Sequence, residues 1–191
     1  MEGAACGRGS GSLQVSGAVL ITRLDAAEAQ SAFRRLDRAV ADTTPIMRAI
    51  GTGLQSNTHD RMDAGQAPDG GAWPALNPTY AAGKRGPGIL RESGMRGGLQ
   101  GSITYRAGRS EVQVGTNKIY GAIHQFGGTI KAKGSGKLAF KMGGRFIRTE
   151  SVTIPARPYL GISSDDQVMI LDVIESALAR ALGTGASSPR R

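Results

Sequence analysis

The chain has 191 residues, which is long enough for one domain with a core that needs no covalent staples. Its single cysteine, Cys6, excludes disulfides within the chain and cysteine-based zinc sites. The net charge of +9, from 24 Lys and Arg against 15 Asp and Glu, favours polyanionic partners such as nucleic acid or an acidic protein surface. Ordinary solubility charge explains that balance equally well.

The two ends of the chain are predicted to lack structure. Residues 1–12 are rich in Gly and Ser, so we expect them to be disordered, and residues 184–191 form a flexible tail. The start lacks the basic and apolar regions of a signal peptide, and no apolar run approaches the roughly 20 residues of a membrane helix. The sequence therefore predicts one domain over residues 13–183, made in the cytoplasm and without a membrane partner.

A strand and two helices are predicted to open this domain. Residues 16–24 alternate apolar side chains as a strand does. Residues 25–42 follow as a helix whose apolar stripe is Ala29, Phe33, Leu36 and Val40. Thr44 is expected to cap a second helix that runs to about Met62, with Pro45 in its first turn and an apolar stripe of Ile46, Ile50 and Leu54. Gly51 and Gly53 either weaken this helix or let a neighbour approach closely.

A loop, a hairpin and a short helix are expected next. Residues 63–88 form a long polar loop that Trp73 anchors at the edge of the core. In the hairpin, Ile103 and Tyr105 alternate on one strand and Val112 and Val114 on the other, around a turn at residues 108–110. The short helix, capped by Thr116 or Asn117 and ended by Gly127 and Gly128, carries Tyr120 and His124 on one face and directs Ile123 and Phe126 to the core.

The last part of the domain is predicted to be an arm and a helix. Residues 129–153 form an extended basic β-hairpin arm. The helix begins with a capping box of Ser164 and Gln167, stops at Gly183, and buries a face of Val168, Leu171, Ile174, Leu178 and Leu182. The fold class is therefore α+β: a small mixed or antiparallel sheet packed by N-terminal helices and a C-terminal helix.

Few residues offer catalytic or metal chemistry. His59 and Asp63 share a predicted helix face, but no motif supplies a third metal ligand. GSGKL at 134–138 lacks the first Gly and the final Ser or Thr of a phosphate loop. His124 is the one candidate for catalysis, and we expect it and Gln125 instead to hydrogen-bond loops such as residues 154–158. The sequence thus predicts no enzyme, metal or cofactor.

Positive charge is concentrated in the arm. The segment from residue 131 to residue 148 contains no acidic residue and six cations: Lys131, Lys133, Lys137, Lys141, Arg145 and Arg148. Alternation along the strands places these cations on the outside, interleaved with apolar side chains. They face phosphates or an acidic partner, or they protect an exposed sheet edge, and the sequence leaves both readings open.

Four blocks in order along the chain carry a resemblance to a known family. GQAPDGGAWPALNPTYAAGK, residues 65–84, resembles the Pro-Asp-Gly-x-x-Trp-x-x-Leu block of the phage virion morphogenesis family, the tail-completion proteins of Mu-like and related tailed phages. The following family blocks are similar to ILRESGMRGGLQGSI (89–103), VQVGTNKIYGAIHQFGG (112–128) and IPARPYLGIS (154–163). Met95 stands where the family usually has Leu, which is a mild departure.

The resemblance implies a non-enzymatic structural protein at the head–tail junction of the virion. Such proteins assemble as rings, commonly hexameric, beside connector and tail proteins, and genomic DNA passes through the lumen. No small-molecule substrate is implied. The residues of the blocks that we expect to serve as structural motifs are Trp73, Tyr120, His124, Gln125, Phe126, Pro155, Arg157 and Pro158. The Arg157 guanidinium is expected either to bridge subunits or to fix its turn.

Three other functions stay open from the sequence. A free nucleic-acid-binding protein would use the basic arm on duplex DNA. A tail terminator would stop growth of the tail tube. A hydrolase would depend on His124.

Overall fold

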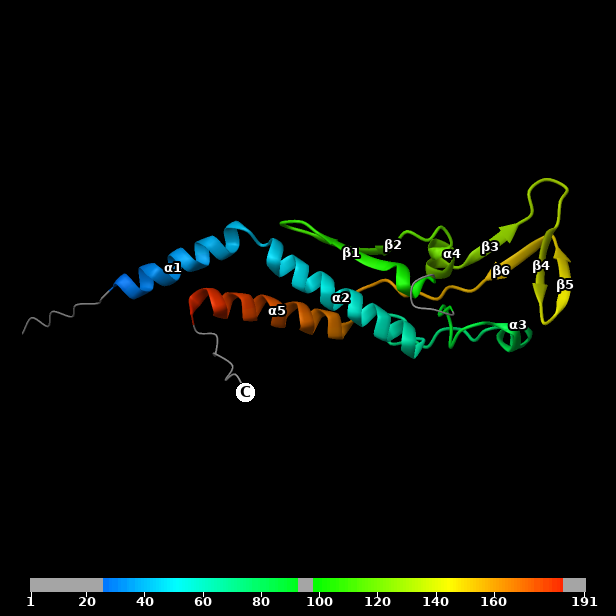
Figure 1. The fold of residues 1–191 in the computed structure, drawn as a ribbon, viewed down its shortest axis with the longest axis horizontal. Helices are drawn as coiled ribbons and strands as arrows, with labels where there is room; N and C mark the ends of the chain where they lie inside the picture. The colour runs from blue at the N-terminus through cyan, green and yellow to red at the C-terminus, as the bar shows by residue number, and fades with distance from the viewer. Residues whose placement is uncertain (1–25, 93–97, 184–191) are drawn as a thin grey trace, which may run out of the picture.

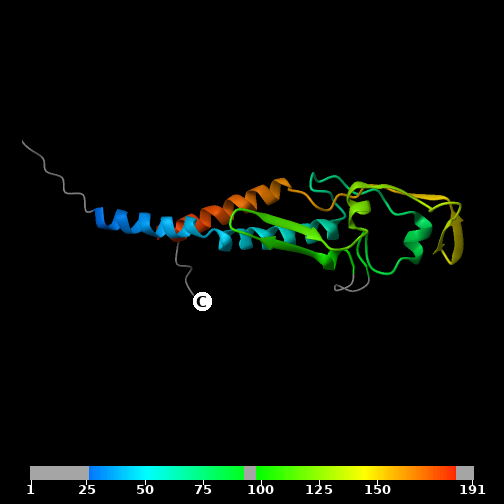
Figure 2. The ribbon, with the colours of Figure 1, turned by 90° about the horizontal axis from the view of Figure 1, so that it is seen from above.

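The computed structural model describes residues 26–92 and 98–183 of the chain. The predicted disordered start, the strand at 16–24, the tail at 184–191 and Met95 lie outside these ranges. The molecule is elongated: α1 (Ala26–Ala41), α2 (Thr44–Ala64) and α5 (Ser164–Leu182) occupy one end, and most of the strands occupy the other (Figures 1 and 2). No helix in the described ranges is long and apolar enough to cross a bilayer.

The α+β class is confirmed, and the described strands pair in three antiparallel two-stranded sheets rather than in one small sheet. The first sheet is the predicted hairpin, β1 (Ile103–Ala107) with β2 (Val112–Thr116). The base of the arm is β3 (Gly128–Lys131) paired with β6 (Ser151–Ile154). Its outer part is the hairpin of β4 (Leu138–Met142) and β5 (Arg145–Thr149). The predicted arm therefore has two successive pieces.

Two short helices connect these parts. The helix α3 (Pro78–Gly83) lies inside the segment predicted as loop, where the Asn77 side chain accepts hydrogen bonds from the amides of Thr79 and Tyr80. The helix α4 (Gly121–Phe126) begins after Tyr120, so the predicted caps Thr116 and Asn117 are wrong. Its end at Gly127 is as predicted.

The long helix α2 joins the helical end of the molecule to the β1–β2 hairpin and to α5. Its Ile50 and Leu54 are buried as predicted. Its N-cap is Thr43 rather than Thr44, and it ends at Gly65, whose positive φ of 68° suits glycine. Gly51 and Gly53 allow close approach by the side chains of Tyr105 and Met169.

Replacing Gly51 with Ala should destabilise the α2–β1 contact. A methyl group at that position would lie 2.3 Å from Cδ2 of Tyr105, so either the Tyr105 ring or the helix α2 must move. We expect a loss of about 1 to 3 kcal/mol in the free energy of unfolding, measured by urea denaturation. Gly83→Ala is the matched control, because a Cβ there has no neighbour within 4 Å. Equal effects of the two substitutions would contradict this packing.

The start of α5 is held by a capping box one residue earlier than predicted. Ser163 is the N-cap, and its hydroxyl accepts from the amide of Asp166, whose carboxylate in turn accepts from the Ser163 amide. At the other end, the Arg35 guanidinium of α1 donates to the carbonyls of Ala181 and Leu182. Because Asn57 and Arg61 of α2 also donate to Asp166, α5 is fixed to α2 at its start and to α1 at its end.

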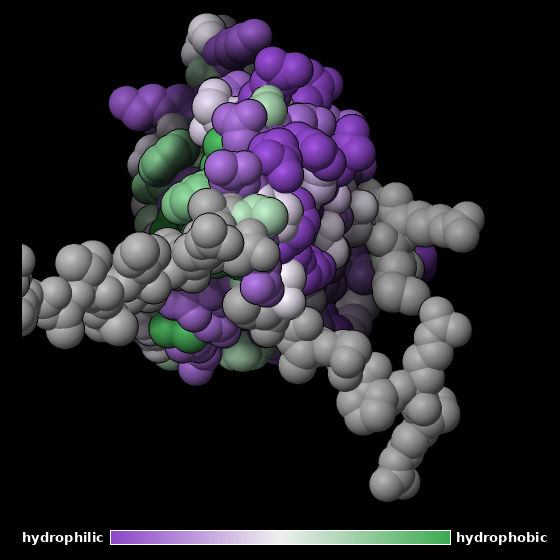
Figure 3. Space-filling view, turned by 90° about the vertical axis from the view of Figure 1, so that its left-hand side faces the viewer, coloured by the Kyte–Doolittle hydropathy of each residue, from purple (hydrophilic) through white to green (hydrophobic). Residues whose placement is uncertain are grey.

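The predicted burial of the apolar face of α5 is wrong for most of its side chains, and the predicted apolar stripe of α1 is also largely exposed. On α1, Phe33 is 69% exposed and Val40 is 55% exposed. On α5, the outward-facing apolar side chains are Val168, Leu171, Leu178 and Leu182, which are 37–58% exposed. Viewed from the helical end, apolar patches lie among hydrophilic residues (Figure 3). Periodicity placed these residues on one side of each helix, and the described chain covers that side only in part. The helices α1 and α5 contact each other, and Leu36 and Ile174 of the two stripes are half-buried.

A small core lies between α2, the 66–73 turn and the loop after β6. Its fully buried members include Met62, Leu99 and Tyr159. Trp73 is 6% exposed and belongs to this core, as its predicted anchoring role requires.

Candidate functional site

The end of α4 and two loops meet at the base of the arm, and we call this junction the clamp: residues 73–75, 124–127 and 157–160. Gln125 of α4 is its central side chain. Its Oε1 accepts from the amides of Tyr159 and Leu160, both at 3.0 Å, and its Nε2 donates to the Leu160 carbonyl at 2.9 Å. Gln125 therefore hydrogen-bonds a loop, as predicted, and its partners directly follow the segment 154–158 named in the prediction.

Trp73 and Arg157 complete the clamp by holding backbone carbonyls. The indole Nε1 of Trp73 donates to the Pro158 carbonyl at 2.7 Å. Arg157, only 5% exposed, donates from Nε to Pro74 and from Nη2 to Ala75. Burial lowers the pKa of Arg157, while Tyr80 acts in the opposite direction. Of the two predicted roles for Arg157, the geometry within the chain matches the fixing of a turn.

Pro155 and Pro158 flank Arg157 and keep this segment extended, as their fixed φ angles require. The chain passes so close to Gly127 that a Cβ there would lie 2.7 Å from the amide nitrogen of Ala156. Gly127 also has a φ of 70°, which side chains rarely adopt. The arm thus leaves α4 in a fixed direction.

His124 contributes through its backbone and its ring in different ways. Its carbonyl accepts from the Arg157 amide at 2.7 Å, as the predicted holding role requires. Its Nδ1, however, is buried without a hydrogen-bond partner. The ring meets Tyr120 edge to face at 6.0 Å, and the Tyr120 hydroxyl donates to Glu92. The ring is therefore a packing element, and the predicted side-chain hydrogen bond is not formed by Nδ1.

We expect the His124 ring to make stability depend on pH. Burial lowers its pKa below the usual 6.5, and the nearby positive charge of Arg157 lowers it further, against a smaller opposite effect of Glu92. The folded state therefore binds a proton less readily than the unfolded state. The stability that the neutral His124 ring contributes is complete above pH 6.5. It is lost as the pH falls through 6.5 towards the pKa of the ring in the folded state.

The test compares thermal melts of the wild type and His124→Phe between pH 7.5 and pH 5, where Phe keeps an aromatic ring without a titrating group. The wild type should lose more stability than the variant over that range. Identical pH profiles would contradict the burial of the His124 ring in the folded state.

Phe126, predicted to face the core, is 78% exposed instead. It lies on the last turn of α4, just before the chain enters the arm. Ile119, which lies just before the start of α4, is 99% exposed. The base of the arm therefore presents apolar side chains to solvent.

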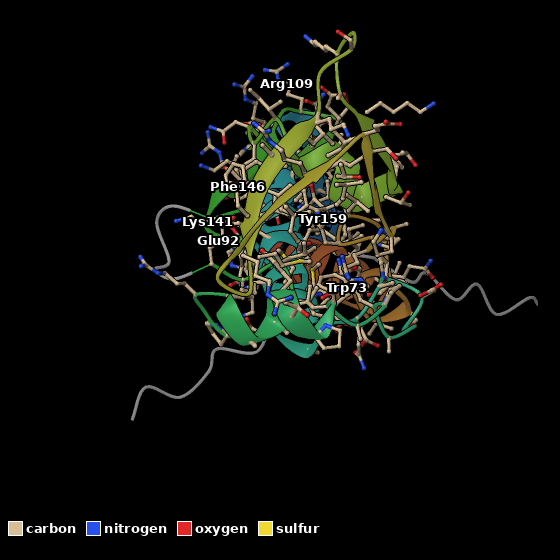
Figure 4. All side chains as sticks on the ribbon, turned by 90° about the vertical axis from the view of Figure 1, so that its right-hand side faces the viewer. Trp73, Glu92, Arg109, Lys141, Phe146 and Tyr159 are labelled. Atoms are coloured by element: carbon tan, nitrogen blue, oxygen red, sulfur yellow. The ribbon has the colours of Figure 1, made fainter. Side chains whose placement is uncertain are left out.

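The arm carries its six cations on the outside. Lys131, Lys133, Lys137, Lys141, Arg145 and Arg148 are all exposed, as predicted. The turn between β4 and β5 packs against α3, where a Cβ on Gly143 would lie 2.4 Å from Thr79 Cγ2. Figure 4 views the molecule from this end and shows Lys141 and Phe146 on the same side of the hairpin. The structure leaves the partner of these cations unassigned.

Sequence reasoning missed a buried ionic network at the start of α5. Asp166 is fully buried and pairs with Arg61 at 2.7 Å, and it also accepts from Asn57 and Ser163. Burial alone would raise the pKa of Asp166, but the hydrogen bonds from Ser163 and Asn57 and the charge of Arg61 outweigh it and lower the pKa. The pattern Ser163-x-x-Asp166 and the Asn57–Arg61 spacing of four on α2 were available signals.

The other sequence candidates for chemistry are structural. Asp63 accepts from Gln100 and pairs with Arg91, so it is not directed at a shared site with His59. Within residues 26–92 and 98–183, no group of three or more His, Cys, Asp or Glu could hold a metal ion. GSGKL is the connection from β3 to β4.

The polar side chains of the clamp and the exposed surface of the molecule have different uses. Its strongest polar side chains fix loops by binding backbone carbonyls and amides, and its exposed features are apolar stripes and a basic arm. Exposed apolar side chains and a basic arm are features of surfaces that contact other molecules. Comparison with known proteins gives a specific assignment: the model of the phage virion morphogenesis family matches residues 24–179. The chain belongs to that family.

Two curated relatives illustrate this membership. The "Mu-like prophage FluMu G protein 2" of Haemophilus influenzae is 34% identical over 79% of this chain and 89% of its own length. The "Putative capsid assembly protein G" of Escherichia phage Mu is 29% identical over 90% of this chain and 98% of its own length. No solved structure matches the chain significantly. The protein therefore has a role in phage virion morphogenesis.

Proposed function

We propose that the protein completes the phage tail at the head–tail junction, as a homo-oligomeric ring around the channel through which the genome passes. Six copies would be the usual number for such a ring. The observation that carries the proposal is the set of exposed apolar side chains on α1 and α5, with Phe33 at 69% and Leu171 at 58% exposed. Apolar faces of this kind on a morphogenesis protein are best explained by burial between subunits or against connector and tail neighbours.

The same proposal assigns no catalytic role, cofactor or small-molecule substrate. Gln125, Trp73 and Arg157 already use their polar atoms on backbone partners within the clamp. The glycine-rich arm and the exposed cations instead serve contacts with a neighbour or with DNA in the lumen.

A phage carrying a deletion of the gene tests the function. We expect lysates with filled heads and free tails of normal length, seen by negative-stain electron microscopy, and restored infectivity when the wild-type chain is supplied in trans. Joined, infectious particles from the deletion phage would contradict the proposal. Overlong tails would instead assign the protein to tail termination.

The exposed cations also favour a second candidate, a free DNA-binding protein. That function requires the isolated chain to bind duplex DNA with an affinity that falls steeply and linearly on a log–log plot against salt. The ring proposal expects little such binding before assembly. Fluorescence anisotropy with a labelled duplex at several salt concentrations separates the two candidates.

A further inference from the structure

The outer hairpin of the arm carries an apolar side chain between two cations on one face. Phe146 pairs directly with Lys141 across the β4–β5 register, and paired residues of antiparallel strands point to the same side. Arg148 lies two residues beyond Phe146 and so shares that face. Phe146 is 62% exposed. We call Lys141, Phe146 and Arg148 the knob.

The opposite face of this hairpin is different. Its apolar side chains are half-buried: Leu138, Phe140, Met142 and Ile147. The turn of the hairpin is packed against Thr79 of α3. Phe146 is therefore not needed for the fold of the arm, and its exposure on the charged face calls for a partner.

A groove of complementary character lies between the end of α2, the 66–70 turn and the start of α5. Its volume is about 660 Å³. Exposed carboxylates from each of these elements line it: Asp60, Asp69 and Asp165. Apolar atoms are supplied by Pro68 and by Ile162, which is 54% exposed. We call this feature the groove.

The charge of the groove is not cancelled from within. Arg61, the one cation among the described residues that line it, is already paired with the buried Asp166. The groove acids do not form a metal-binding group among the described residues. Beyond the groove, the exposed Val168 lies one helical turn after Asp165 on the same side of α5. An occupant should therefore be apolar at its centre and positively charged at its edges.

We propose that the knob of one copy docks in the groove of the next copy. Phe146 would be buried against Ile162 and Pro68, and Lys141 and Arg148 would face the carboxylates of the groove. An aromatic anchor in a pocket, surrounded by opposite charges, is the usual form of an energetically dominant contact. The inference rests on the proposed ring and names its subunit contact.

The placement of the two surfaces makes this contact run head to tail. Figure 1 shows the β4–β5 hairpin at one end of the elongated molecule and the start of α5 near its middle. Both surfaces are exposed in the same chain, so knob and groove of one copy do not occupy each other. A contact between two different surfaces propagates from copy to copy and closes into a ring when the rotation permits.

Charge reversal provides the sharpest test. The arm variant Lys141→Glu/Arg148→Glu and the groove variant Asp69→Lys/Asp165→Lys should each associate at least about tenfold more weakly than the wild type, by analytical ultracentrifugation of the full chain. Mixed in equal amounts, the two variants should assemble again, because each arm then meets a groove of opposite charge. Arg106→Glu/Arg109→Glu reverses two exposed cations on the β1–β2 hairpin and should leave association unchanged.

Cross-linking in assembled particles tests the same contact even if the purified chain does not associate in solution. In a Cys6→Ser background, Phe146→Cys and Ile162→Cys should form a disulfide between different copies in purified virions. Absence of that cross-link, or failure of the mixed variants to assemble when the wild type does, would overturn the inference. A separate variant that keeps Cys6 and carries only Ile162→Cys tests the other occupant: a disulfide between these two cysteines within one copy would also overturn the inference, because the groove would then hold the start of the same chain.

The inference and the proposed function can fail separately. If the deletion phage shows free heads and tails but the knob–groove cross-link is absent, the junction role stands and the subunit contact is wrong. If the cross-link forms but the deletion phage makes joined, infectious particles, the contact stands and the junction role is wrong.

Discussion

Asp166→Ala should be among the most destabilising single substitutions in this protein. The change removes a carboxylate that accepts from Arg61, Asn57 and Ser163 and leaves the Arg61 guanidinium largely buried without its counter-charge. Breaking a buried pair in this way costs about 3 to 5 kcal/mol in the free energy of unfolding. In a chain of this length the melting temperature should fall by on the order of 10 °C, measured by circular dichroism.

The adjacent Asp165→Ala is the matched control, because Asp165 is exposed and contributes only a helix-end charge effect. In acid, the wild type should also lose folding stability through protonation of Asp166, and the Asp166→Ala variant should lack that loss. The pKa of Asp166 is lowered in the folded state, so its contribution is present above the usual value of 3.8 and disappears as the pH falls through the folded pKa. A loss as small as that of Asp165→Ala would show that the buried network is not formed.

Trp73→Ala is the second substitution with a large expected effect. It removes a core side chain that is 6% exposed and the indole donor that holds the Pro158 carbonyl. Truncating a buried Trp typically costs about 3 to 5 kcal/mol. Because Trp73 and Arg157 connect the 73–75 loop to the segment after β6, we expect the arm to become mobile as well, measured by faster amide exchange of β3 and β6.

Two further variants separate the parts of this effect. Trp73→Phe keeps most of the apolar volume and leaves the Pro158 carbonyl without its donor, so it should cost less than Trp73→Ala. Phe146→Ala truncates an aromatic that is 62% exposed and should change stability by less than about 0.5 kcal/mol. Comparable losses for Trp73→Ala and Phe146→Ala would contradict the assignment of core and surface.

Helix and hairpin positions could be predicted because their signals are local. The apolar spacing of Ile50 and Leu54 identified the buried side of α2, and alternation identified the β1–β2 hairpin. The capping box was misplaced by one residue, because Ser163-x-x-Asp166 and Ser164-x-x-Gln167 both fit the pattern. Contacts of Asp166 with Arg61 and Asn57, distant in sequence, decide between them.

The burial of apolar stripes could not be predicted from periodicity. A stripe such as Val168–Leu171–Leu178 shows which side of a helix avoids water, but not whether the same chain or another molecule covers it. The same limit of periodicity explains why Phe126, predicted to face the core, is exposed. The basic arm was recognised from its charge run, whereas its division into two paired segments depends on the β3–β6 register.

The candidate site was partly visible in the sequence. Gln125, Trp73 and Arg157 were singled out from the family blocks, and the structure brings them together in the clamp. The groove was not visible, because it is assembled from three separated segments whose residues are unremarkable alone. The start of α3 had a local signal in Asn77-Pro78 that the sequence prediction did not use.

Immunogold labelling of purified virions tests the central claim most directly. A phage that encodes the chain with an epitope tag, and that remains infectious, would be labelled after partial opening of the particles and imaged by electron microscopy. The account predicts gold at the junction of head and tail on most particles. Gold over the capsid shell or at the distal tail tip, or virions from which the tagged chain is absent, would contradict a structural role at the junction.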